Sequence, residues 1–222
     1  QSKTATERRL TVELTANPDW YAVQALPVIG NPAEEDALSW ATAYYANSLA
    51  TAIVKANPRI KQVFDTWMAQ GGNKETLLSN LERNQDLKNL LLEETPWISE
   101  ATEESEQKRR IALLFDLNSM NNRLRTSVER LQELQLADGS WSWYKGMTGS
   151  RYITTQIVEM LARLQHMNVT LDGKVAPMYT RALGYLQKAV KEDYETMKKL
   201  EKEGTTTLVP NGQVVHYLYV CT

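Results

Sequence analysis

The side chains of this chain that could carry out chemistry are mainly carboxylates. Two suitably placed carboxyl groups suffice to hydrolyse a glycosidic bond. The candidates are Asp138, Asp172 and the consecutive Glu34, Glu35 and Asp36. No spacing selects a pair among them, and Asp138 and Asp172 each precede a glycine, as ordinary turn residues do. These residues therefore permit a carbohydrate-active enzyme without indicating one.

A hydroxyl nucleophile is the second possibility, because Ser39 follows Asp36 by three residues. A nucleophilic serine needs a positioned base, and His166 and His216 both lie far away in the sequence. Asp36 is better explained as the cap of a helix N-terminus, where a carboxylate is favoured. His166 falls near a predicted helix C-terminus, which favours a structural role. With two histidines and one cysteine, Cys221, we expect neither a zinc site nor another cofactor.

The composition excludes several classes of partner. The chain has 222 residues and a formal charge of −2, so it offers no basic stripe for binding nucleic acid. It contains no run of about 18 apolar residues that could span a membrane, and we expect these residues to make no membrane contact. A hydrophobic content of 42% is typical of a globular protein with a packed core.

Hydrophobic periodicity predicts an almost entirely helical chain. Apolar residues recur at helical spacing over residues 33–52, 58–70, 73–81, 87–92, 99–115, 120–134, 153–167 and 176–203. The apolar run 21–29 is interrupted by Pro27, and the run 214–220 predicts one more helix or strand. Residues 9–14 alternate between apolar and polar types, which predicts a strand. Short connections favour antiparallel packing of successive helices.

The most informative local motif is the stretch from Gln135 to Tyr144. Gly139 is placed to adopt the left-handed conformation that closes a helix, and Gln135 can bind the backbone groups freed there. Trp141 can fill the gap between neighbouring helical hairpins. Asp138 belongs to the same motif as a turn residue. One buried aromatic side chain is enough to fill the space at a helix end, so Trp143 and Tyr144 are not needed for packing there. We therefore expect a packing motif with two aromatic side chains left to line a surface.

The pattern Gln135, Gly139, Trp141 resembles the QW-type motif of α/α-toroid proteins, such as terpenoid cyclases. Together with the stretches at residues 17–27 and 44–51, it is similar to the thioester domain of bacterial alpha-2-macroglobulin-family proteins. That resemblance implies an all-α toroid of antiparallel helical hairpins over residues 17–222, which we expect to be an incomplete piece of the ring. Residues 1–16, with a short β segment, would be the tail of a preceding β-domain or a linker.

The family's thioester motif, Cys-x-Glu-Gln, aligns with Asp36, Ala37, Leu38 and Ser39. A carboxylate replaces the cysteine and a hydroxyl replaces the glutamine, so no thioester can form. The resemblance implies a non-enzymatic domain in an extracytoplasmic, membrane-anchored lipoprotein that traps proteases or acts in surface defence. Its partners would be the other domains of the parent chain and target proteases. The alternatives are a toroid enzyme acting on carbohydrate or isoprenoid, and a purely structural interaction domain.

Overall fold

The computed structural model describes residues 18–56, 58–69, 72–94, 104–204 and 209–222. Within these ranges the regular elements are nine helices, and extended backbone is limited to two isolated bridges between residues 135 and 149. The helices are α1 (Pro18–Ile29), α2 (Ala37–Lys55), α3 (Pro58–Ala69), α4 (Lys74–Arg83), α5 (Gln85–Glu94), α7 (Glu104–Leu134), α8 (Arg151–His166), α9 (Val175–Lys202) and α10 (Gly212–Val220). The all-α class is confirmed, and the toroid stays a prediction. The strand expected over residues 9–14 lies outside the described residues.

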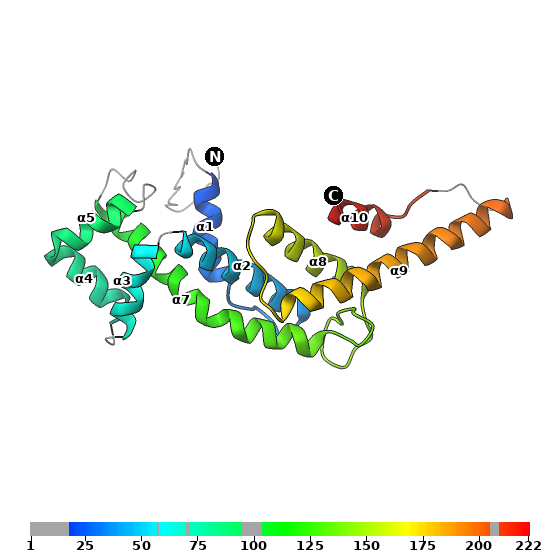
Figure 1. Ribbon diagram of the computed structural model, residues 1–222, viewed down its shortest axis with the longest axis horizontal. Helices are drawn as coiled ribbons and strands as arrows, with labels where there is room; N and C mark the ends of the chain where they lie inside the picture. Colours follow the sequence, from blue (N-terminus) through cyan, green and yellow to red (C-terminus); the bar gives the residue numbers. More distant parts are fainter. Residues whose placement is uncertain (1–17, 57, 70–71, 95–103, 205–208) are drawn as a thin grey trace, which may run out of the picture.

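The helices α2 and α7 form the centre of an elongated molecule and run antiparallel (Figure 1). Four alanines of α2 are fully buried, namely Ala37, Ala43, Ala46 and Ala50. Because a methyl side chain occupies little space, neighbouring helices can approach α2 closely. The N-terminus of α2 thereby lies beside the C-terminus of α7, where Glu35 is 4.0 Å from Arg130.

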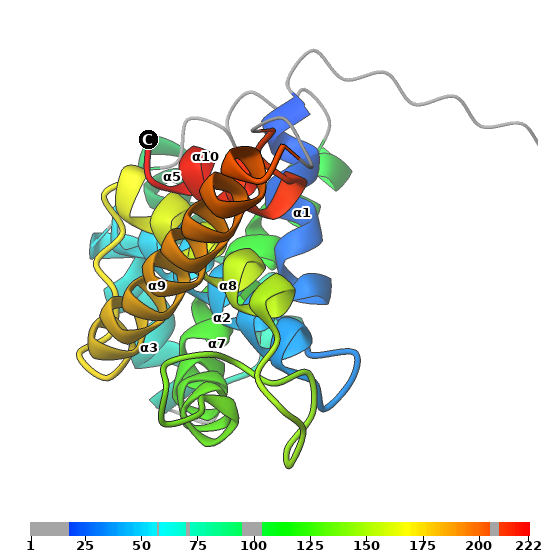
Figure 2. The same cartoon turned by 90° about the vertical axis from the view of Figure 1, so that its right-hand side faces the viewer.

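Two hydrophobic clusters share these two helices. The first packs the N-terminal half of α2 and the C-terminal half of α7 against α8 and α9. The second packs the other halves of α2 and α7 against α1 and α5. The helices α3, α4 and α5 therefore lie at one end of the molecule and the projecting half of α9 at the other (Figure 1), and Figure 2 looks along this axis from the α9 end.

Several helix starts follow local capping chemistry that the sequence predicts. The helix α3 begins at Pro58, as expected from the fixed backbone angle of proline at a first helical position. The carboxamide oxygen of Asn73 accepts a hydrogen bond from the Thr76 N–H at 2.9 Å and caps α4. None of the helices in the described ranges is long and apolar enough to span a membrane.

Two predicted interruptions are wrong. Residues 99–115 and 120–134 are predicted as separate helices, but α7 continues from Glu104 to Leu134, because the polar residues between them bond within α7 or to α3 and α4. The Ser119 hydroxyl donates to the Phe115 carbonyl, and Asn118 donates to Asp65. Pro27 was expected to break the apolar run, but α1 ends only at Ile29. The Gly30 N–H closes the turn around Pro27 by donating to the Leu26 carbonyl at 2.7 Å.

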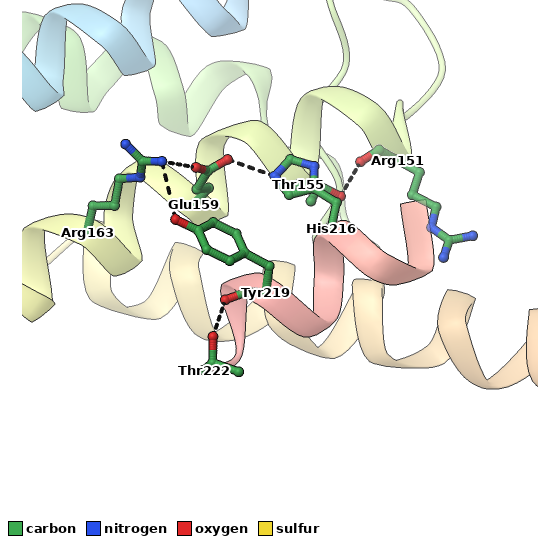
Figure 3. A network of polar contacts seen from close by, with 7 residues as sticks. All are labelled: Arg151, Thr155, Glu159, Arg163, His216, Tyr219 and Thr222. Carbon is green, nitrogen blue, oxygen red and sulfur yellow. Dashed lines mark hydrogen bonds and ion pairs between the residues drawn. The ribbon is translucent and has the colours of Figure 1, made fainter. Parts of the chain in front are cut away.

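The last helix, α10, packs on α8 and α9 through both apolar and polar contacts. Val214 is buried, and Tyr217 and Val220 pack against the first cluster. The imidazole Nε2 of His216 lies 2.7 Å from the Glu159 carboxylate, which also pairs with Arg163 (Figure 3). The run 214–220 is therefore a helix with one face buried against its neighbours.

A second polar contact holds the start of α10. Asn211 caps the helix by accepting the Val214 N–H, and its amide group donates to the Asp193 carboxylate. Asp193 in turn pairs with Arg151 of α8 at 2.6 Å. The Arg151 guanidinium lowers the pKa of Asp193 by hydrogen bonding to its charged form.

We expect Ala46→Leu to destabilise the protein by about 1–3 kcal/mol, because α2 and α7 leave no room for three more carbon atoms there. Ala176→Leu, at an exposed position of α9, is the control and should change the free energy of unfolding by less than about 0.5 kcal/mol. Urea denaturation followed by circular dichroism measures both. Equal stabilities of the two variants would contradict close packing of α2 at Ala46.

The Asp193 contact predicts a pH dependence. Because the folded-state pKa of Asp193 is lowered, its charge stabilises the fold above the ordinary aspartate pKa of about 3.9, and this contribution is lost as pH falls through the lowered value. Asp193→Asn should lower the melting temperature at pH of about 7 and reduce the further loss on acidification. Glu195→Gln, an exposed neighbour in α9, is the control. Identical melting profiles for the two variants would contradict the prediction.

Candidate functional site

The two segments singled out in the sequence meet in the structure. The connection between α7 and α8, here called the 135–150 loop, passes the N-terminus of α2. The backbone N–H of Ala37 donates a hydrogen bond to the carbonyl of Trp143 at 2.9 Å. The four positions that the family resemblance assigns to the thioester motif therefore lie directly beside the aromatic motif, although about a hundred residues separate them in the sequence.

Asp36 and Ser39 are both engaged in capping α2. One carboxylate oxygen of Asp36 accepts the N–H groups of Leu38 and Ser39 at 2.8 and 2.9 Å. The other accepts the Ser39 hydroxyl at 2.7 Å. Asp36 and Ala37 are buried, and Leu38 and Ser39 are half-buried. This arrangement satisfies the helix N-terminus and leaves Ser39 bonded to a carboxylate that already serves the backbone.

A charged rim surrounds this helix start, and the sequence did not reveal it. The Trp40 indole donates to Glu35 at 3.3 Å, and the Arg130 guanidinium lies 5.8 Å from the centre of the Trp40 ring. Arg130 also pairs with Glu133, which Lys145 of the 135–150 loop approaches to 3.5 Å. The helical period places Trp40 on a face with Asp36, but no local signal identifies Arg130 as its neighbour.

Gln135 connects the end of α7 to the start of α9. Its side-chain amide donates to the carbonyls of Gly139 and Met178 at 3.1 and 2.8 Å, and its oxygen accepts from Arg181. The bond to Gly139 is the backbone contact that the sequence predicted. The bonds to α9 were missed, because nothing near Gln135 indicates which helix lies opposite.

Gly139 has the left-handed backbone that the motif predicted, with a φ of 91°. A Cβ atom at this position would collide with the backbone carbonyl of Arg181 in α9. Glycine is therefore required twice, once for the turn and once for the close approach of α9.

Trp141 is a core residue. Its side chain is fully buried in the first cluster, and its indole N–H donates to the Leu131 carbonyl at 2.9 Å. Its backbone N–H donates to the Thr154 hydroxyl of α8 at 2.9 Å. Trp141 thus joins α7 and α8 and is not available as a platform for a ligand.

Of the carboxylates considered for glycoside hydrolysis, Asp36, Asp138 and Asp172 each accept hydrogen bonds within their own turn. Asp138 accepts the N–H and the hydroxyl of Ser140 at 3.0 and 2.7 Å, and the hydroxyl bond lowers its pKa. Asp172 accepts the Lys174 N–H at 2.8 Å in front of α9. A general acid in a glycosidase requires a raised pKa, so the lowered pKa of Asp138 opposes that assignment. Glu34 and Glu35 are exposed.

Trp143 and Tyr144 project from the 135–150 loop. Their side chains are 43% and 45% exposed, and Met147 in the same loop is 53% exposed. We call these three residues the aromatic tip. The carbonyl of Trp143 is bound to Ala37, and the neighbouring Ser142 forms a bridge with Gly149. The backbone beneath the tip is therefore tied to α2 and across its own loop.

The remaining candidates for chemistry lie elsewhere. His166 is exposed at the end of α8, His216 pairs with Glu159, and Cys221 is exposed near the end of α10. Among the described residues, no three histidine, cysteine or acidic side chains lie close enough together to hold a metal ion.

Comparison with protein-family models found no family that matches this chain, and searches of curated proteins and of solved structures found no match either. The function is therefore proposed from the residues, their geometry and the resemblance noted in the sequence.

The two glycines with similar backbone angles in the 135–150 loop provide a matched test. Gly146→Ala places a Cβ in open space at a φ of 88° and should cost about 1 kcal/mol from the left-handed backbone alone. Gly139→Ala adds the collision with Arg181 and should cost at least about 2 kcal/mol. Urea denaturation compares them. An equal loss for both variants would show that α9 does not press on Gly139.

Proposed function

We propose that this chain is a thioester-deficient domain of a bacterial alpha-2-macroglobulin-like protein and acts by non-covalent protein contact in protease trapping or surface defence. The observation that carries this proposal is the joint arrangement of the α2 N-terminus and the aromatic tip. The side chains of Asp36 and Ser39 form hydrogen bonds that cap α2. The loop that is bonded to the same helix start carries exposed aromatic side chains.

The chemistry of the α2 N-terminus supports contact without covalent attachment. A thioester needs a cysteine and a glutamine, and Asp36 and Ser39 occupy the aligned positions. As a nucleophile, Ser39 would need a base, and its one carboxylate partner already accepts two backbone N–H groups. These residues are suited to holding α2 in place.

The aromatic tip supports protein contact as the mechanism. Tryptophan, tyrosine and methionine are enriched at protein interfaces because they combine a large apolar area with polarisable or hydrogen-bonding groups. Side chains on a backbone that is already fixed lose less conformational entropy on binding. The tip therefore has the composition and the support expected of an interface anchor.

The proposed setting follows from the resemblance in the sequence. We infer an extracytoplasmic parent chain, anchored to a membrane as a lipoprotein, in which this domain contacts other domains of the parent or a target protease. The toroid enzyme acting on carbohydrate or isoprenoid receives no support from the carboxylates, since Asp36, Asp138 and Asp172 each bond within their own turn.

A protease panel tests the proposal. Active-site-blocked serine, cysteine, aspartic and metalloproteases are passed over the immobilised 222-residue chain, and we expect reversible binding of at least one class. Combining Trp143→Ser with Tyr144→Ser should weaken it by at least about tenfold, because both residues are exposed anchors. Tyr194→Ser, at an exposed tyrosine of α9, is the control and should change affinity by less than about twofold.

The same samples test the absence of a covalent step. Methylamine should leave the mass of the chain unchanged and release no thiol, and the protease complex should separate in denaturing detergent. A methylamine adduct would show that the thioester alignment is wrong. Absence of binding to every protease, or an equal loss in the tip variant and the Tyr194 control, would overturn the proposed contact.

A further inference from the structure

A second surface, separate from the aromatic tip, lies at the other end of α2. It is a groove with a volume of about 840 Å³, bounded by the C-terminal half of α2, the middle of α7 and the connection between α8 and α9. That connection, residues 167–174, runs beside α2 in Figure 1. The groove size falls within the range of known binding clefts.

The groove is built by contacts within the fold. Tyr44 of α2 is 2% exposed, and its hydroxyl accepts the Asp172 N–H at 3.1 Å. This bond joins the connection to α2, and the buried Val128 of α7 lines the groove beside it. Burial raises the pKa of Tyr44, so its hydroxyl stays protonated and neutral at physiological pH.

The polar groups in the lining favour a peptide over a purely apolar occupant. Ser48 and Thr51 of α2 are buried polar residues that line the groove, and Asn168 contributes an exposed carboxamide on the opposite side. Covering the exposed Asn168 carboxamide with an alkyl chain would remove it from water without replacing its hydrogen bonds. A peptide backbone supplies both donors and acceptors to replace those bonds.

The charge of the lining selects the kind of peptide. Lys55, Arg125 and Lys174 line the groove from three different elements, whereas Asp172 is the one acidic residue among the described residues of its lining. Asp172 already accepts the Lys174 N–H, and Arg125 pairs with Glu129 outside the groove. In the described part of the chain, neither Lys55 nor Lys174 forms an ion pair. The groove is therefore positive although the whole chain has a charge of −2.

We propose that this groove binds a short acidic peptide segment of a partner protein, with an apolar side chain over the half-buried Ala52 and Leu124 and its carboxylates near Lys55 and Lys174. The binding segment lies across the groove, so that its backbone meets the exposed carboxamide of Asn168. This site uses none of the residues of the aromatic tip. Its failure and the failure of the proposed protease contact are therefore separable experimentally.

Selection from a random heptapeptide display library against the 222-residue chain tests this proposal. We expect the selected peptides to be enriched in aspartate or glutamate together with apolar residues. The double variant Lys55→Glu with Lys174→Glu should weaken a synthetic selected peptide by at least about tenfold, since it reverses both charges. The control, Lys191→Glu with Lys202→Glu, makes the same charge change outside the groove and should stay within about twofold.

Three outcomes would overturn the proposal. In the first, the selected peptides lack acidic residues. In the second, they bind both double variants equally, which would place the contact outside the groove. Octanoate could instead bind with the same dependence on Lys55 and Lys174 while no peptide is selected, which would assign the groove to a fatty-acid-like ligand. Circular dichroism of both double variants at equal concentration separates loss of binding from loss of folding.

Discussion

The close antiparallel pairing of α2 with α7 is the contact on which the rest of the structure depends. The fully buried alanines of α2 have small side chains, so α7 and the neighbouring helices can pack closely against α2. Both helices cross both hydrophobic clusters, and thereby join α3, α4 and α5 to the assembly of α8, α9 and α10. The same pairing brings the end of α7, and with it the 135–150 loop, to the first turn of α2.

The 135–150 loop has buried residues that pack against the helices and exposed residues that form a surface. Trp141 is buried in the first cluster, and Gln135 bonds to both the loop backbone and α9. The exposed Trp143 and Tyr144 follow the buried Trp141 after one intervening residue, the buried Ser142. Because the loop is bonded to α2, α7, α8 and α9, its exposed aromatic side chains are held in place before any partner arrives, which lowers the entropic cost of binding.

The two ends of α2 differ in charge and in the contacts they can make. At the N-terminus, Asp36 satisfies the free backbone N–H groups that could otherwise attract an anion or polarise an acyl group. Near the C-terminus, Lys55 joins Arg125 and Lys174 around a groove with buried hydroxyls. The aromatic tip beside the first turn of α2 and the cationic groove near its last turns are therefore two separate surfaces.

Much of the local structure is determined by the sequence alone. The all-helical class, the start of α3 at Pro58, the capping of α2 by Asp36 and the left-handed Gly139 all depend on residues within one or two turns, where propensity and short-range hydrogen bonds decide the outcome. The continuity of α7, the bond between Ala37 and Trp143, and the groove beside Tyr44 were decided only by the tertiary structure. Each of these joins residues far apart in the sequence, and which distant groups meet is set by how the apolar helix faces pack together.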